Sequence, residues 1–215
     1  MINTVILISG NGSNLQAIID ACKDSNTTHK KLPINIVAVI SSNPDAYGLQ
    51  RAREAGIHTE VLDHKQFENR QAFDLALQNL IDQFKPGLIV LAGFMRILTD
   101  DFVNHYLGRM MNIHPSLLPQ FPGLNTHQQA LEKGVKQHGA SVHFVTPELD
   151  GGPVIIQAQV PVKENDSAQS LQARVLEQEH KIYPTAIRWF AENRLCLKNN
   201  AAHLDGCQLE QPKGE

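Results

Sequence analysis

Cysteine is scarce in this sequence, and the few that occur do not support a cross-linked or zinc-bound fold. The 215 residues include three cysteines, Cys22, Cys196 and Cys207, which is an odd number with wide spacing. That pattern argues against a disulfide framework and against a cysteine-based zinc site. A chain of this length buries about two-thirds of its unfolded surface, so it needs neither kind of cross-link. We therefore expect a reduced, cytoplasmic protein.

Long hydrophobic runs and an excess of positive charge are also absent. The longest strongly apolar stretch lies near residues 88–95, whereas a membrane-spanning helix needs about 20 such residues. The apolar residues 5–8 lack the basic segment and the cleavage site of a signal peptide, so none is expected. Lys and Arg number 19 against 22 Asp and Glu, and the net charge of −3 predicts no general nucleic-acid surface. We expect a soluble protein that binds neither membranes nor nucleic acids.

Short apolar runs alternate with helical periodicity over about the first 115 residues. Strands are expected at residues 5–8, 34–40, 59–62, 88–92 and 110–113. Helices are expected from Asn14 to Cys22, at residues 47–55 and at residues 66–84, and residues 25–33 are expected to form a polar loop. This alternation is typical of a parallel sheet built from strand–helix–strand units.

The pattern changes after residue 115. A short helix at residues 128–133 precedes two strand candidates, residues 141–145 and 154–162, with no helix between them, which predicts an antiparallel addition. Residues 167–192 form a long amphipathic helix, which Ser167 caps and Pro184 should kink or divide. We predict one α/β domain over residues 1–195, with an open, mostly parallel, Rossmann-like sheet and helices on both faces. Residues 196–215 are expected to form a peripheral tail.

A glycine-rich turn follows the first predicted strand. Residues 9–14 read Ser-Gly-Asn-Gly-Ser-Asn and lead into the first helix, where backbone N–H groups can converge on a phosphate. A dinucleotide fingerprint would need a third glycine at Leu15 and an acidic residue after the second strand, and a Walker loop would need a lysine. The turn therefore suits a single phosphate monoester, or it is a tight turn with a helix cap and no ligand.

Two polar side chains end the strand at residues 110–113. Asn112 and His114 project to the same side because side chains alternate along a strand. A carboxamide donates hydrogen bonds, and an imidazole can donate, accept or become charged near neutral pH. Together they suit stabilisation of an oxyanion in acyl transfer, although backbone groups can equally well satisfy both.

Other polar residues are weaker candidates for parts of a site. Asp150 lies in a turn with two glycines, where its carboxylate can orient a histidine or make a local hydrogen bond. Ser116 follows His114, but no nucleophile elbow surrounds it. His138 and His143 have no partner motif for a metal, so no metal site is predicted.

Four segments of the sequence occur in the order and spacing of a known family. They are residues 8–16, 91–96, 112–119 and 149–153. Together they resemble the phosphoribosylglycinamide formyltransferases, folate-dependent enzymes of purine biosynthesis, and the resemblance extends from Val5 to about Leu195. It implies transfer of a formyl group from 10-formyltetrahydrofolate, as cosubstrate, to the amine of glycinamide ribonucleotide. It also implies direct attack by that amine, without a covalent enzyme intermediate or a metal.

The resemblance also implies roles for particular residues. Asn112 and His114 would stabilise the oxyanion, and Asp150 would keep His114 charged or relay the amine proton through water. The residues implied in ribonucleotide binding are Gly12, Ser13, Asn14 and Glu179. The residues implied in folate binding are Arg70, Met95, Arg96, Ile97, Leu98, Asn112 and Asp150.

Two positions depart from the family pattern, and three other functions were compared with it. Asn125 stands where a histidine is expected, and Leu176 where a polar residue near the ribose is expected, so the finer substrate contacts are in doubt.

A formyltetrahydrofolate deformylase would carry an additional N-terminal domain, and a methionyl-tRNA formyltransferase would carry an additional C-terminal domain. A non-catalytic nucleotide-binding module would explain the glycine-rich turn but not Asn112, His114 and Asp150. A monomer or weak homodimer is expected.

Overall fold

The computed structural model of the chain describes residues 1–23 and 31–214. Residues 25–30 of the predicted polar loop lie outside the described residues. The chain divides into two compact units, Met1–Met111 and Asn112–Glu215, and each is described by itself.

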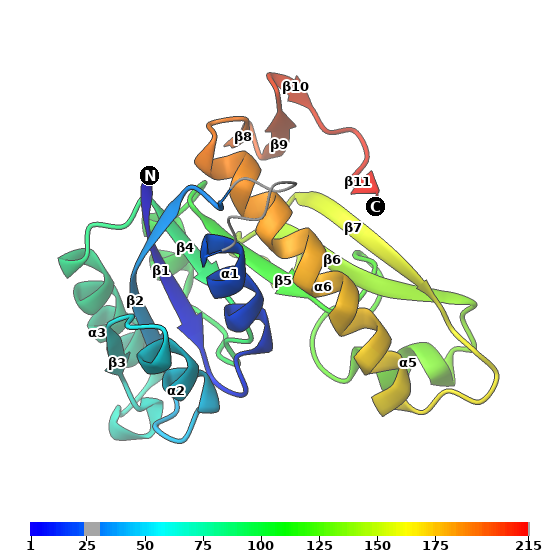
Figure 1. The fold of residues 1–215 in the computed structure, drawn as a ribbon, viewed down its shortest axis with the longest axis horizontal. Helices are drawn as coiled ribbons and strands as arrows, with labels where there is room; N and C mark the ends of the chain where they lie inside the picture. The colour runs from blue at the N-terminus through cyan, green and yellow to red at the C-terminus, as the bar shows by residue number, and fades with distance from the viewer. Residues whose placement is uncertain (24–30, 215) are drawn as a thin grey trace. The chain divides into compact units, whose positions relative to one another are not determined.

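The first unit consists of parallel strands that alternate with helices (Figure 1). Its elements are β1 (Ile2–Ile8), α1 (Ser13–Lys23), β2 (Ile34–Ser41), α2 (Tyr47–Glu54), β3 (Thr59–Val61), the 3₁₀ turn η1 (His64–Gln66), α3 (Arg70–Gln83), β4 (Leu88–Leu91) and α4 (Asp100–His105). The strands lie in the order β4-β1-β2-β3, and each neighbouring pair is parallel. The predicted strand–helix alternation is therefore confirmed.

Continuous burial explains why the central strands were recognisable. Residues 4–8 of β1 and all of β4 are buried, as expected of strands that are covered on both faces. The start of α3 was predicted wrongly at residue 66. The helix begins at Arg70 because the Asn69 side chain accepts a hydrogen bond from the Ala72 N–H and caps it. Helix α4 was not predicted, since its six residues are too few to show a period.

The second unit contains an antiparallel strand pair and one long helix. After β5 (Met110–His114), which begins in the first unit, come α5 (Thr126–Glu132), β6 (Gln137–Phe144), β7 (Val154–Pro161) and α6 (Ala168–Ala191). Strands β6 and β7 pair in antiparallel fashion, as predicted. In Figure 1, α6 runs along these two strands, and it is in contact with both. The fold is thus α/β, with a mostly parallel sheet and an antiparallel addition.

Helix α6 begins and ends within one residue of the prediction, with Ser167 as its N-cap and Glu192 as its C-cap. Ser167 and Ser170 form a reciprocal capping box at its start. Pro184 was predicted to kink or divide the helix, and it does not divide it, because α6 is continuous from Ala168 to Ala191. Buried Ile182, Tyr183, Ala186 and Ile187 flank the proline, and their packing holds the helix together despite the lost N–H. In the part of the chain that is described, no helix combines the length and apolarity needed to cross a membrane.

The residues after α6 form short strands. Strands β8 (Leu195–Lys198), β9 (Ala201–Leu204) and β10 (Cys207–Gln208) make a small antiparallel sheet. Strand β11 (Lys213–Gly214) pairs in parallel with β7. The division into a domain over residues 1–195 and a tail over residues 196–215 stays a prediction.

Candidate active site

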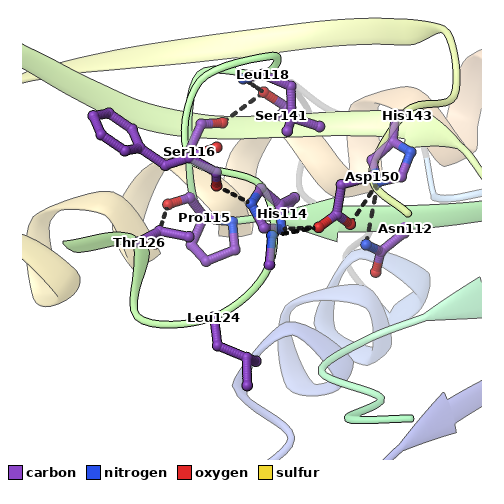
Figure 2. Close-up of polar contacts among 12 residues, drawn as sticks. Asn112, His114, Pro115, Ser116, Leu118, Leu124, Thr126, Ser141, His143 and Asp150 are labelled. Carbon is purple, nitrogen blue, oxygen red and sulfur yellow. Dashed lines mark hydrogen bonds and ion pairs between the residues drawn. The ribbon is translucent and has the colours of Figure 1, made fainter. Parts of the chain in front are cut away.

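Three polar residues proposed from the sequence lie together in the second unit (Figure 2). Asn112 and His114 are alternate residues of β5, and His114 is buried. Asp150 lies in the turn between β6 and β7, with a φ of 51°. Its Oδ2 is 3.4 Å from Nδ1 of His114 and accepts a hydrogen bond of 2.9 Å from the Gly123 N–H. The structure therefore brings the predicted histidine and carboxylate within ion-pair distance of each other.

The turn that carries Asp150 depends on a glycine. A β-carbon on Gly152 would overlap the carbonyl oxygen of Phe144, so no larger residue fits there without a backbone shift. The close approach of the backbone at Gly152 to the backbone at Phe144 constrains the conformation of the turn that carries Asp150.

His143 of β6 completes the group, and it was not among the predicted site residues. Its Nδ1 lies 2.9 Å from the Phe144 carbonyl oxygen, and its Nε2 lies 3.2 Å from Nδ2 of Asn112 and 3.8 Å from Oδ1 of Asp150. Burial lowers the pKa of His143, so the ring is neutral near pH 7. Nδ1–H then donates to the carbonyl, and Nε2 accepts from the carboxamide of Asn112.

This arrangement orients the side chain of Asn112. A carboxamide nitrogen carries two hydrogens, and one of them is directed at His143. The other hydrogen makes no hydrogen bond to the described residues. From the sequence, His143 was considered only as a metal ligand and rejected as one. Its contact with Asn112 depends on the pairing of strands, which is not visible in local spacing.

His114 is held by oxygen atoms on both sides of its ring. Its Nε2 lies 2.8 Å from the carbonyl oxygen of Phe121, and its Nδ1 faces Asp150. A ring that is protonated on both nitrogens satisfies both acceptors. Nε2 is already engaged by the Phe121 carbonyl, so donation from it to any other oxygen would require that carbonyl to move away.

Side-chain hydrogen bonds define the loop after β5, which contains Phe121 and Gly123. The Ser141 hydroxyl donates to the Ser116 carbonyl at 2.6 Å and accepts from the Leu118 N–H at 3.0 Å (Figure 2). Thr126 donates to the Pro115 carbonyl at 2.7 Å. These bonds position the loop against His114 and Asp150.

The glycine-rich turn of the first unit lies at the start of α1. Gly12 has a φ of 75°, and a β-carbon there would lie 2.6 Å from the Cα of Gly48. Helix α1 begins at Ser13, so the N–H groups of Ser13 and Asn14 belong to a helix N-terminus, which favours an anion. Gly12 is thus required by the fold, and the turn also has the geometry of an anion site.

Arg51 of α2 holds this turn from the side. Its guanidinium donates to the carbonyl and to the side-chain oxygen of Asn11, at 2.9 and 3.0 Å. It also lies over the Tyr47 ring, 4.8 Å from the centroid. The sequence prediction omitted Arg51, whose contact with the turn depends on how α2 packs. A fixed positive charge beside the turn adds to its preference for anions.

The remaining predicted residues are placed as follows. Arg70 is the first residue of α3, and Met95, Arg96, Ile97 and Leu98 lie between β4 and α4 in the first unit. Glu179 is buried on α6 of the second unit. Asn125 has a φ of 57° at the start of α5, and Leu176 is half-buried on α6. Within residues 1–23 and 31–214, no group of three or more histidine, cysteine or acidic residues could hold a metal.

Comparison with known proteins identifies the family and agrees with the fold. The family model described as formyl transferase matches residues 2–187, and the chain belongs to that family. It is 58% identical to a phosphoribosylglycinamide formyltransferase of Escherichia coli (strain K12) over 99% of this chain and 97% of that one. It is 48% identical to the phosphoribosylglycinamide formyltransferase of Haemophilus influenzae, over 95% of this chain and 94% of that one. The structure of the phosphoribosylglycinamide formyltransferase from Coxiella burnetii superimposes with a TM-score of 0.92 at 50% identity, covering 99% of this chain and 98% of that one.

Proposed function

We propose that the chain transfers the formyl group of 10-formyltetrahydrofolate to the amine of glycinamide ribonucleotide, giving formylglycinamide ribonucleotide and tetrahydrofolate. The observation that supports this most directly is the ion pair of His114 with Asp150 beside Asn112, in a chain so similar to phosphoribosylglycinamide formyltransferases. Acyl transfer to an amine needs an electrostatic partner for a developing oxyanion and a route for one proton. The three side chains supply both.

The proposed reaction proceeds by direct attack. The amine nitrogen bonds to the formyl carbon, and the formyl oxygen becomes an oxyanion. The second N–H of Asn112 and the charge of His114 stabilise that oxyanion. As the bond from carbon to the folate nitrogen breaks, this nitrogen gains the proton that the amine loses. Asp150 accepts or relays the proton, directly or through one water, and no metal takes part in these steps.

The binding residues form the second part of the proposal. The ribonucleotide phosphate binds at Gly12, Ser13 and Asn14, where the helix N-terminus and the nearby Arg51 favour an anion. Glu179 contacts the nucleotide. The folate binds against Arg70, residues 95–98, Asn112 and Asp150. The proposal includes a cytoplasmic location and a monomer or weak homodimer.

One assay tests the function against its alternatives. Purified protein is mixed with 10-formyltetrahydrofolate, and tetrahydrofolate is followed spectrophotometrically with and without glycinamide ribonucleotide. We expect release only when the ribonucleotide is present. Release without it would support a deformylase instead, and no release under either condition would support a nucleotide-binding module.

A further inference from the structure

Loop 93–99 connects β4 to α4 and contains four of the proposed folate residues. The loop belongs to no helix or strand, and its residues Met95 and Ile97 are 68% and 57% exposed. A segment of this kind is free to take many conformations unless its ends are fixed. Its conformation matters here, because residues 95–98 must present a defined surface to a ligand.

Ser9 fixes the beginning of loop 93–99. Its backbone N–H donates to the Gly93 carbonyl at 3.0 Å, and its hydroxyl oxygen accepts from the Met95 N–H at 2.9 Å. The same hydroxyl lies 2.8 Å from the hydroxyl of buried Ser42. Ser9 is therefore bonded to the loop twice, and its side chain is also bonded to Ser42, the residue that follows β2.

Asp74 fixes the end of loop 93–99. Its Oδ2 accepts a hydrogen bond of 2.5 Å from the Thr99 N–H, and the Thr99 hydroxyl is also bonded to the carboxylate. Thr99 in turn caps α4, since its Oγ1 accepts from the Phe102 N–H at 3.4 Å. The last loop residue is thus clamped between α3 and the start of α4.

The burial of the Asp74 carboxylate costs free energy, which a purely structural role does not explain. The residue is 2% exposed, and burial raises the pKa of its carboxyl group. Its second oxygen, Oδ1, has no hydrogen-bond partner among the described residues. The charges of Arg70 and Arg96, both in the proposed folate set, favour the ionised form. A buried carboxylate with one unsatisfied oxygen is expected where function requires it.

We propose that Ser9 and Asp74 are positioning residues, which hold the two ends of loop 93–99 and thereby set the affinity for formyl folate. The inference rests on the proposed function, which assigns residues 95–98 to the folate. A loop that is already ordered loses less conformational entropy when its ligand binds. Removing either anchor therefore weakens folate binding without touching the folate or the reacting atoms.

The test compares Ser9→Ala and Asp74→Ala with a matched control, Asp82→Ala. Asp82 lies on the same helix as Asp74, and its side chain is hydrogen-bonded to Tyr106, at 2.8 Å, and to His105, both outside loop 93–99. Ser9→Ala and Asp74→Ala, the two anchor variants, each remove a side-chain hydrogen bond to the loop. Each is expected to raise the KM for 10-formyltetrahydrofolate about 5- to 20-fold. The KM for the ribonucleotide should change less than about twofold. The control should lower the melting temperature and leave both KM values near those of the parent protein. Asp74→Asn, which keeps an acceptor for the Thr99 N–H, should recover part of the affinity.

Two direct measurements keep this inference separate from the proposed function. Calorimetry with 10-formyldihydrofolate gives the Kd without turnover, and hydrogen exchange reports the order of residues 93–99 in the unliganded protein. Faster exchange and weaker binding in both anchor variants would support the inference, even if the parent protein transferred no formyl group. An unchanged Kd in an active parent protein would overturn the inference and leave the proposed function standing. Equal losses for both substrates, or no folate binding by the parent protein, would also overturn it.

Discussion

The backbone of Gly12 lies directly against that of Gly48, so close that a β-carbon on Gly12 would come within 2.6 Å of the Gly48 Cα. The glycine-rich turn is therefore fixed by the first turn of α2. The Gly48 N–H reinforces the contact by donating to the Gly10 carbonyl at 3.1 Å. Any ligand held by the turn depends on this packing.

Gly12→Ala should damage both the fold and the binding of the ribonucleotide. The new side chain meets backbone rather than a flexible side chain, and it must adopt a φ of 75°. We expect the free energy of unfolding to fall by about 2–4 kcal/mol and the KM for the ribonucleotide to rise. Gly10→Ala is the matched control, because nothing lies within 4 Å of its β-carbon position. Equal behaviour of the two variants in denaturant titrations and kinetics would contradict this account.

Asn112→Ala and His114→Ala should each reduce kcat with little change in KM for either substrate. Loss of one group that stabilises an oxyanion typically lowers kcat about 10²–10³-fold. Because both groups act on one developing charge, the double variant should lose less than the product of the two single effects. Steady-state kinetics on variants with native circular dichroism measure this. Near-native turnover in both single variants would show that the oxyanion is stabilised elsewhere.

Asp150→Asn should abolish most turnover in a protein that still folds. Asparagine tolerates the φ of 51°, and its side-chain oxygen can still accept from the Gly123 N–H. The negative charge beside His114 is lost, and with it the group that accepts the proton. We expect a large fall in kcat, retained binding of both substrates and a nearly unchanged melting temperature. A lower melting temperature with turnover preserved per folded molecule would instead mark Asp150 as structural.

Stability should fall as the pH is lowered from about 6.5 to about 4. Burial, with a smaller contribution from nearby His127 and His114, lowers the pKa of His138 from about 6.5 to about 4. In this window the unfolded chain binds a proton that the folded chain does not. The stabilisation is therefore complete above about pH 6.5 and is lost on acidification, by on the order of 3 kcal/mol in total. The pKa values of His127 and His143 are also lowered by burial, so they act in the same direction.

Denaturant titrations of His138→Gln between pH 7 and pH 5 measure this contribution. The variant should lose about 2 kcal/mol less than the parent protein over that range, whatever its stability at pH 7. His58→Gln serves as the control, because His58 is half-exposed and lies outside this cluster. An identical dependence on pH in the parent protein and in His138→Gln would refute the assignment.

The sequence predicted elements whose stabilising contacts are local or whose burial is continuous. The strands at β1, β2 and β4 are uninterrupted apolar runs, and the Ser167 cap of α6 is a local motif. The start of α3 was missed because Phe67 continues the apolar period beyond the true cap at Asn69. In the structure Phe67 packs on Phe73, with ring centroids 5.5 Å apart, from outside the helix.

The candidate site was predictable as a set of residues but not as a network. Strand alternation indicated Asn112 and His114 and a glycine turn indicated Asp150, but only the resemblance to the family joined the three into one site. The hydrogen bond from Asn112 to His143 joins residues 31 positions apart, so it depends on how strands pair. The bonds of Ser9 to Met95 and of Asp74 to Thr99 are equally remote in sequence. Contacts of this kind arise from tertiary packing, so local sequence patterns do not predict them.

The pairing of β11 with β7 has a consequence for association between copies of the chain. A sheet edge presents unpaired N–H and C=O groups on which a strand from another molecule can assemble. Here the short strand Lys213–Gly214 lies along Ile156 and Gln157 and occupies that position. Shortening the chain before residue 213, or drawing this segment away with a fused tag, would uncover the edge of β7 at Ile156 and Gln157 and favour aggregation through strand addition.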